Sequence, residues 1–183
     1  MKSVANILLR ARAWQVFLLI AGFVPAVIVT RLILSGPDAV LGIRFGFAVG
    51  TEVVFICVSL WLWSLGTFLE SAVSPSLRPS GRFFYVSVIF PVIYIPLFEV
   101  LFPKLTTHPV EFALIFLIHF FAVFCGFYNY YFVSKCLALA EKNRPVSYAD
   151  YRGYFLGCWF FPAGVWFIQP RINRLFAQRG SIQ

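Results

Sequence analysis

The sequence predicts an all-α integral membrane protein, with four transmembrane helices in a bundle and a C-terminal re-entrant or short fifth hydrophobic helix. Of its 183 residues, 61% are hydrophobic and only 12% are charged, whereas soluble domains average about 25% charged residues. Four apolar stretches are also long enough to cross a bilayer, since one span needs about 20 residues. Residues 1–183 are therefore expected to form a single transmembrane domain.

The first predicted span covers about residues 14–34. A cleaved signal peptide is the alternative for this segment, because Arg10 and Arg12 precede the apolar run. The run is longer than the apolar core of an ordinary signal peptide, so an uncleaved span is expected.

Three further spans are predicted at about residues 45–69, 83–102 and 110–140. The span at residues 83–102 contains Pro91 and Pro96. A spanning helix tolerates proline where neighbouring groups satisfy the carbonyls that it leaves free. The fourth is longer than a bilayer requires, and this excess length allows the helix to tilt or to extend beyond the lipid.

Residues 155–169 form the C-terminal hydrophobic segment. It is short for a span, and apolar stretches of this length are more often re-entrant or interfacial. Pro162 and Gly164 lie where a hairpin would turn, because proline interrupts a helix and glycine accepts unusual dihedral angles. A short, kinked fifth span is the alternative.

Two amphipathic elements are expected to flank this segment. Ser147 and Asp150 are spaced as a variant of the capping box and predict the start of an interfacial helix. After Pro170, residues 171–179 mix basic and apolar side chains and predict an amphipathic tail at the membrane surface.

The positions of lysine and arginine predict the orientation, because cytoplasmic loops carry the excess of these residues. With the N-terminus inside, nine lie on the cytoplasmic side and three, Arg31, Arg44 and Lys104, on the outer side. The C-terminal tail adds three more. A re-entrant segment gives twelve against three and a fifth span gives nine against six, so the re-entrant alternative and a cytoplasmic C-terminus are favoured.

The run from Phe161 to Asn173 reads FPAGVWFIQPRIN. It resembles the end of a group of uncharacterised bacterial membrane proteins, in which a P-x-G-x-W-F-I-Q-P-R-I-N motif follows several spans. The resemblance covers this segment and the general pattern of spans. It implies a multi-pass protein of the bacterial cytoplasmic (inner) membrane, and the group has no established activity that could be transferred.

This segment and the residues next to it supply the candidate residues for contact with lipid or a partner protein. Tryptophans suit a polar–apolar boundary, and the polar side chains could bond to lipid phosphates, to a partner or to backbone freed by the break. Stabilisation of the hairpin is the default interpretation. The candidates are Trp159, Trp166, Gln169, Arg171, Asn173 and Arg174.

A second set of candidates consists of ionisable residues within the predicted spans, where charge is costly and often functional. Arg31, Glu52, Glu99 and His119 all fall in the outer half of the membrane, opposite the C-terminal motif. They could form a pocket in which Arg31 holds an anion and the others move protons. The alternative is an Arg31 ion pair that only fixes helix packing.

Several classes of function are excluded or disfavoured. The four cysteines lack the spacing of a zinc or redox pair, and no phosphate-binding or hydrolase motif is present. No cofactor or metal is therefore expected. The net charge of +8 fits anchoring to anionic lipid better than binding to nucleic acid.

The sequence thus favours a non-catalytic protein that acts by binding a membrane-protein partner or membrane lipid, and a homo-oligomer is the alternative to a different membrane-protein partner. The alternative is a small transporter or a lipid-modifying enzyme that uses the outer polar set.

Overall fold

The computed structural model describes residues 2–22, 25–27, 29, 33, 39–105, 109–161 and 163–180, and in these residues the chain is helical without a strand. The helices are α1 (Lys2–Arg10), α2 (Ala13–Ala21), α4 (Ala39–Ala72), α5 (Arg82–Leu105), α6 (Pro109–Lys142), α7 (Tyr148–Trp159) and α8 (Val165–Gly180).

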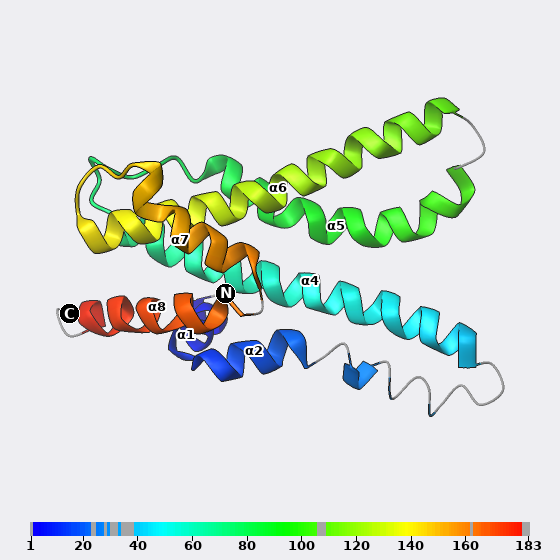
Figure 1. Ribbon diagram of the computed structural model, residues 1–183, viewed down its shortest axis with the longest axis horizontal. Helices are drawn as coiled ribbons and strands as arrows, with labels where there is room; N and C mark the ends of the chain where they lie inside the picture. Colours follow the sequence, from blue (N-terminus) through cyan, green and yellow to red (C-terminus); the bar gives the residue numbers. More distant parts are fainter. Residues whose placement is uncertain are drawn as a thin grey trace.

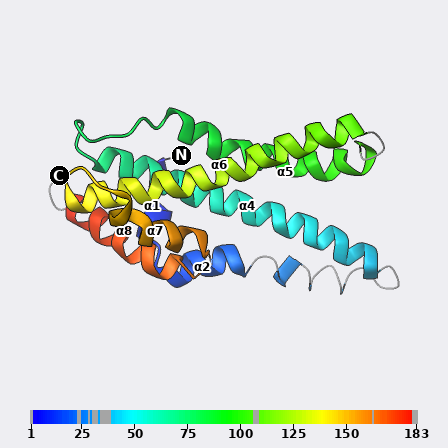
Figure 2. The same cartoon turned by 45° about the horizontal axis from the view of Figure 1, so that its top comes forward.

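The molecule is elongated, and its two ends differ (Figures 1 and 2). At one end, α1 and α2 pack against α4 and α8, and α7 packs against α6 and α8. At the other end, α4 diverges from the α5–α6 pair. The α4–α5 connection, the α6–α7 connection and the C-terminus all lie at the packed end (Figure 1).

Two helices are long and apolar enough to cross a membrane, namely Val49–Ala72 within α4 and Ala113–Lys142 within α6. Only 11% of the most apolar window of α6 is buried against the rest of the chain. The apolar part of α5, Arg82–Phe98, is shorter than these two helices. The all-helical class is confirmed, and the predicted number of four spans stays a prediction.

Helices α4, α5 and α6 cover the residues of the three later predicted spans, and each extends one to six residues beyond them. The first span is different. Ahead of it the chain forms α1, which the sequence analysis did not predict, and the chain bends by 118° between α1 and the helix that follows. Much of the predicted span 14–34 lies outside the described residues.

Local signals account for the start of α7. Ser147 precedes the helix, and its backbone N–H donates to Asp150 Oδ2 at 2.8 Å, as the capping box predicts. The Asp150 carboxylate also forms salt bridges with Lys142 and Arg144. The hydrogen bond from Lys142, followed by that from the Ser147 backbone, lowers the pKa of Asp150 well below its usual range.

Pro170 does not separate an interfacial tail from the segment before it, because α8 is continuous from Val165 to Gly180 with Pro170 inside it. Proline removes one helical hydrogen bond. Gln169 and Asn173, on either side of it, are bonded to each other at 3.0 Å, which reinforces the helix across this point.

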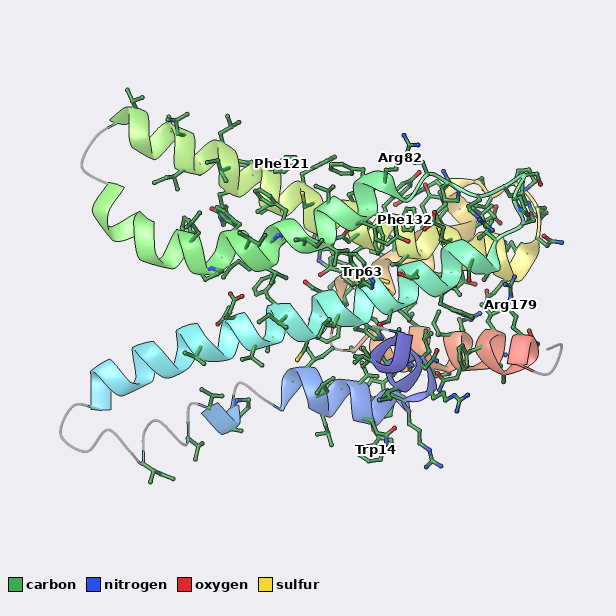
Figure 3. All side chains as sticks on the ribbon, turned by 180° about the vertical axis from the view of Figure 1, so that it is seen from behind. Trp14, Trp63, Arg82, Phe121, Phe132 and Arg179 are labelled. Atoms are coloured by element: carbon green, nitrogen blue, oxygen red, sulfur yellow. The ribbon has the colours of Figure 1, made fainter. Side chains whose placement is uncertain are left out.

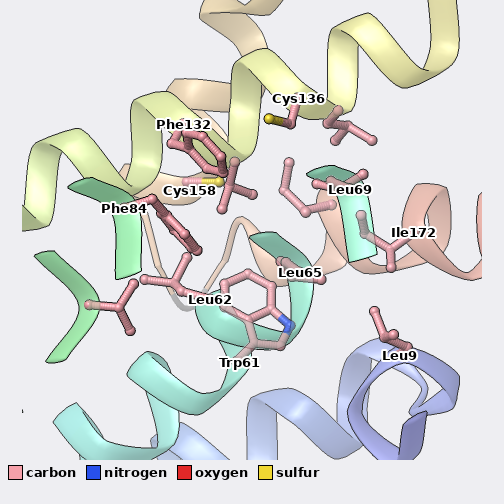
Figure 4. Close-up of a cluster of buried hydrophobic side chains, with 14 of the residues drawn as sticks. Leu9, Trp61, Leu62, Leu65, Leu69, Phe84, Phe132, Cys136, Cys158 and Ile172 are labelled. Carbon is pink, nitrogen blue, oxygen red and sulfur yellow. The ribbon is translucent and has the colours of Figure 1, made fainter. Parts of the chain in front are cut away.

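The core lies at the packed end, where α4, α5 and α6 meet the hairpin of α7 and α8 (Figure 4). The rings of Phe84 and Phe132 stack with centroids 4.4 Å apart. Gly66 makes room for this stack, since a Cβ there would lie 2.3 Å from the Phe84 ring. Between helices in a membrane, close packing of this kind stabilises the bundle through van der Waals contact.

One buried polar contact joins α5 to α6. Ser87 donates its hydroxyl proton to Asn129 Oδ1 at 2.6 Å, and Asn129 Nδ2 donates to the Ser87 carbonyl at 3.1 Å. Both residues are almost fully buried. Reciprocal bonds of this kind hold two apolar helices in one relative position.

Candidate functional site

The C-terminal motif builds a helical hairpin. The end of α7 leads into a turn from Phe160 to Gly164, and α8 then returns to the packed end of the molecule (Figure 1). Gly164 N–H donates to the Phe160 carbonyl at 3.1 Å. The predicted turn at Gly164 is therefore observed, while Pro162 lies outside the described residues.

A close backbone contact fixes the hairpin. A Cβ placed on Gly164 would lie 1.3 Å from the carbonyl oxygen of Gly157 in α7. Only glycine lets the two segments approach this closely. The turn therefore depends on the residue type at position 164 and not on local flexibility alone.

Gln169 lies at the centre of the hairpin base and is fully buried. Its Oε1 accepts a hydrogen bond from Trp61 Nε1 at 2.9 Å. Its Nε2 donates to the carbonyls of Leu8 and Ala11 at 2.9 and 3.0 Å. The side chain thus faces the interior of the protein, where it joins α8 to α4 and to the junction of α1 and α2.

Asn173 adds to the same contact, because its Nδ2 donates to the Ala11 carbonyl at 3.2 Å. Carbonyls at the C-terminus of a helix lack partners within the helix. Gln169 and Asn173 supply such partners at the end of α1 and at the bend that follows. One prediction was that these side chains bond to backbone groups that lack a helical partner. They do so, but the backbone groups belong to the N-terminal helices and not to the hairpin.

Arg171 lies on another face of α8, beside α6 and α7. Its Nη1 is 3.3 Å from Glu141 Oε1 and 3.4 Å from the hydroxyl of Tyr154. Tyr154 in turn donates to Glu141 Oε2 at 2.6 Å. The guanidinium side chain remains 39% exposed, so it also faces the surroundings of the protein.

A groove runs along the hairpin from this charged group. Its volume is about 420 Å³, and Arg171 and Tyr154 line one part of it while Phe160 and Phe167 line another. These phenylalanines are 64% and 70% exposed. The exposed Arg174 lies within electrostatic range of Tyr154. The groove therefore combines one basic side chain with an apolar wall, and a second basic side chain lies near Tyr154.

Arg179 joins the tail to α4 through a contact that the sequence did not predict. Its guanidinium donates to the carbonyls of Ser71 and Ala72 at the C-terminus of α4, and it lies between α4 and α8 (Figure 3). A cation at a helix C-terminus is stabilised by the helix dipole. Because these partners are about a hundred residues apart in sequence, no local pattern marked them.

The two candidate tryptophans, Trp159 just before the motif and Trp166 within it, lie on the surface of the hairpin. Trp159 is 44% exposed and Trp166 is 50% exposed. The Trp159 ring is 4.1 Å from that of Phe127, and the Trp166 ring is 6.1 Å from that of Phe17. Trp159, Trp166, Arg171 and Arg174 are thus accessible to lipid or a partner, in contrast to Gln169.

The structure brings part of the second candidate set into a pocket. His119 Nδ1 is 3.1 Å from the hydroxyl of Tyr94, and both residues line a pocket of about 340 Å³ between α4, α5, α6 and α7. Glu52 is half-buried on α4 and is not among the residues that line this pocket. Arg31 and the side chain of Glu99 lie outside the described residues.

Trp159 lines the same pocket as His119. The expected separation of the C-terminal motif from the polar set therefore does not hold at this residue. The end of α7 packs along the bundle, where the Trp159 ring contacts that of Phe127. The depth of Trp159 in the membrane could not be predicted from its position in the sequence.

Within the described part of the chain, no group of three histidine, cysteine, aspartate or glutamate side chains is placed to hold a metal ion. Of the cysteines, Cys125, Cys136 and Cys158 are buried and unpaired. Comparisons of the chain with protein-family models, with curated proteins and with solved structures found no match.

Proposed function

We propose that the chain is a multi-pass protein of the bacterial cytoplasmic membrane, which acts without catalysis by binding anionic phospholipid at its α7–α8 hairpin. The observation that carries this proposal is the hairpin groove, where Arg171 shares the lining with the exposed Phe160 and Phe167, and the exposed Arg174 lies within electrostatic range of Tyr154 in the same lining. A phospholipid has the matching chemistry, a negative headgroup joined to apolar chains.

The dimensions of the hairpin support its placement at one face of the membrane. The 12 residues of α7 rise about 18 Å, less than the roughly 30 Å of the hydrocarbon core. Since α8 returns toward the end from which α7 starts (Figure 1), the pair would enter the membrane and leave on the same side. The excess of basic residues at that end favours the cytoplasmic side.

A reporter fused after Gln183 tests this orientation. We expect a cytoplasmic signal from a reporter that distinguishes cytoplasm from periplasm, because a returning hairpin leaves the tail inside. The same reporter fused after Lys104, in a truncated chain, is the control and should report the periplasm. A periplasmic signal at Gln183 would contradict the re-entrant hairpin.

The lipid site is tested by measuring retention of phosphatidylglycerol and phosphatidylcholine with native mass spectrometry of the purified protein. We expect preferential retention of phosphatidylglycerol. Replacing Arg174 with glutamine should reduce this preference about three- to tenfold, because an exposed positive charge that attracts the anionic headgroup is lost. Arg171→Gln should reduce it further.

Arg82→Gln is the matched control, since Arg82 is an exposed arginine at the start of α5, far from Arg179 and the hairpin tail (Figure 3). Because Arg171 also pairs with Glu141, Arg174→Gln is the more decisive variant. Equal loss in Arg82→Gln, or no preference in the unaltered protein, would refute the site. A stoichiometric protein that co-purifies without lipid preference would instead favour a protein partner.

A further inference from the structure

The pocket between α4, α5, α6 and α7 is separate from the hairpin groove and contains its own polar pair. Tyr94 is 8% exposed and its hydroxyl meets the ring of His119. The residues that line the pocket are otherwise mainly apolar or aromatic: Phe55, Pro91, Ile95, Ala122, Val123, Gly126, Phe127, Tyr130 and Trp159. Apolar walls with a few convergent polar groups are typical of ligand sites, and the volume lies in their usual range of roughly 300–1,000 Å³.

The hydrogen-bonding chemistry of the pair selects one kind of ligand atom. If Tyr94 donates to His119 Nδ1, the neutral imidazole still carries a proton on Nε2. If His119 Nδ1 donates to Tyr94, the phenolic proton is left to donate. In both tautomers the pair retains one donor, which suits an acceptor oxygen such as a carbonyl.

The aromatic lining of the pocket indicates the shape of the rest of the ligand. Phe127 and Trp159 contact each other at 4.1 Å, and Phe55, Tyr94 and Tyr130 add further rings. Flat aromatic or conjugated rings pack well against such surfaces in offset or edge-to-face arrangements. Within the membrane placement proposed above, only a ligand that partitions into lipid would reach this depth.

We propose that this pocket binds a lipid-soluble quinone, with one carbonyl oxygen accepting a hydrogen bond from the Tyr94–His119 pair and the ring held among the aromatic side chains. The site is independent of the phospholipid groove, and either could be absent without the other.

Gly126 provides a direct way to fill the pocket. It lines the pocket, and a Cβ at this position would meet nothing within 4 Å. Gly126→Leu should therefore occupy the space of the ligand without displacing protein atoms, and leucine is a good helix former. Gly153 is the matched control, because its Cβ is equally unobstructed but it lines the hairpin groove.

Trp159 serves as the reporter, because quinones quench tryptophan fluorescence at short range. The experiment titrates decylubiquinone into the full-length protein in phosphatidylcholine nanodiscs. We expect a saturable component of quenching above the linear, collisional quenching of exposed residues such as Trp14 and Trp166. Trp159→Phe and Gly126→Leu should abolish the saturable component, and Gly153→Leu should retain it.

Tyr94→Phe and His119→Phe should weaken the apparent affinity about three- to tenfold, since each removes one member of the hydrogen-bonding pair. Decylbenzene, which lacks the carbonyl, should not compete. The proposal is overturned if the unaltered protein gives no saturable quenching, if Gly126→Leu leaves it intact, or if decylbenzene competes as well as the quinone. Loss of phospholipid preference in Gly153→Leu with intact quinone quenching separates the two sites.

Discussion

Replacing Gly164 with alanine is expected to prevent the α7–α8 hairpin from closing. The added Cβ would lie 1.3 Å from the Gly157 carbonyl oxygen, a backbone atom that no rotamer change can move. The backbones must separate, which breaks the buried packing of Val165, Ile168 and Ile172 against the core. We expect a loss of about 4 kcal/mol or more in the free energy of unfolding, beyond the usual range for point substitutions.

Thermal unfolding can be followed with a thiol-reactive dye, because the buried Cys136 and Cys158 become reactive when the core opens. Gly153→Ala is the matched control on the same hairpin, since its Cβ meets nothing within 4 Å, and it should be neutral or stabilising by up to about 1 kcal/mol. Gly157→Ala should also be tolerated, because its Cβ would make an ordinary 3.5 Å contact with Ile168.

The asymmetry between the two glycines that meet in the hairpin makes this prediction specific. A general need for small residues would make Gly157→Ala and Gly164→Ala equally harmful. A Gly164→Ala protein that unfolds within a few degrees of the unaltered protein would show that the close contact does not hold the hairpin.

The features that the sequence predicted correctly are those fixed by neighbouring residues. Ser147 and Asp150 locate the start of α7 because the capping contact spans three residues. Gly164 locates the turn because it combines a helix break with a short apolar segment. The limits of α4 and α6 follow from long apolar runs, whose ends are set by polar residues close in sequence.

The features that it did not predict depend on contacts between distant segments. Gln169 reaches the Leu8 carbonyl across 161 positions and Trp61 across 108. Its polarity was apparent in the sequence, but its partners were not, and a surface role was equally consistent with its basic neighbours. Trp159 joins His119 in one pocket only because α7 packs along α6.

Replacing Gln169 with leucine is expected to detach the N-terminal helices from the hairpin. Leucine preserves much of the volume but leaves the Trp61 N–H and the Leu8 carbonyl without their present partner in a buried environment. Each unsatisfied buried group costs about 1–3 kcal/mol, so we expect a loss of roughly 2–6 kcal/mol. Asn173→Ala should cost less, because the Ala11 carbonyl keeps its bond to Gln169.

A double-mutant cycle separates the hydrogen bonds from the loss of packing. Trp61→Phe removes the donor that Gln169→Leu leaves unsatisfied, so the double variant should be more stable than the sum of the two single changes predicts, by about 1 kcal/mol or more. The same thiol-reactive assay measures all three proteins. Additive effects would mean that Gln169 acts through packing alone. A coupled result would mean that Gln169 stabilises the fold through its hydrogen bonds as well as its packing, and that it is buried in the hairpin to join α8 to α4 and to the N-terminal helices.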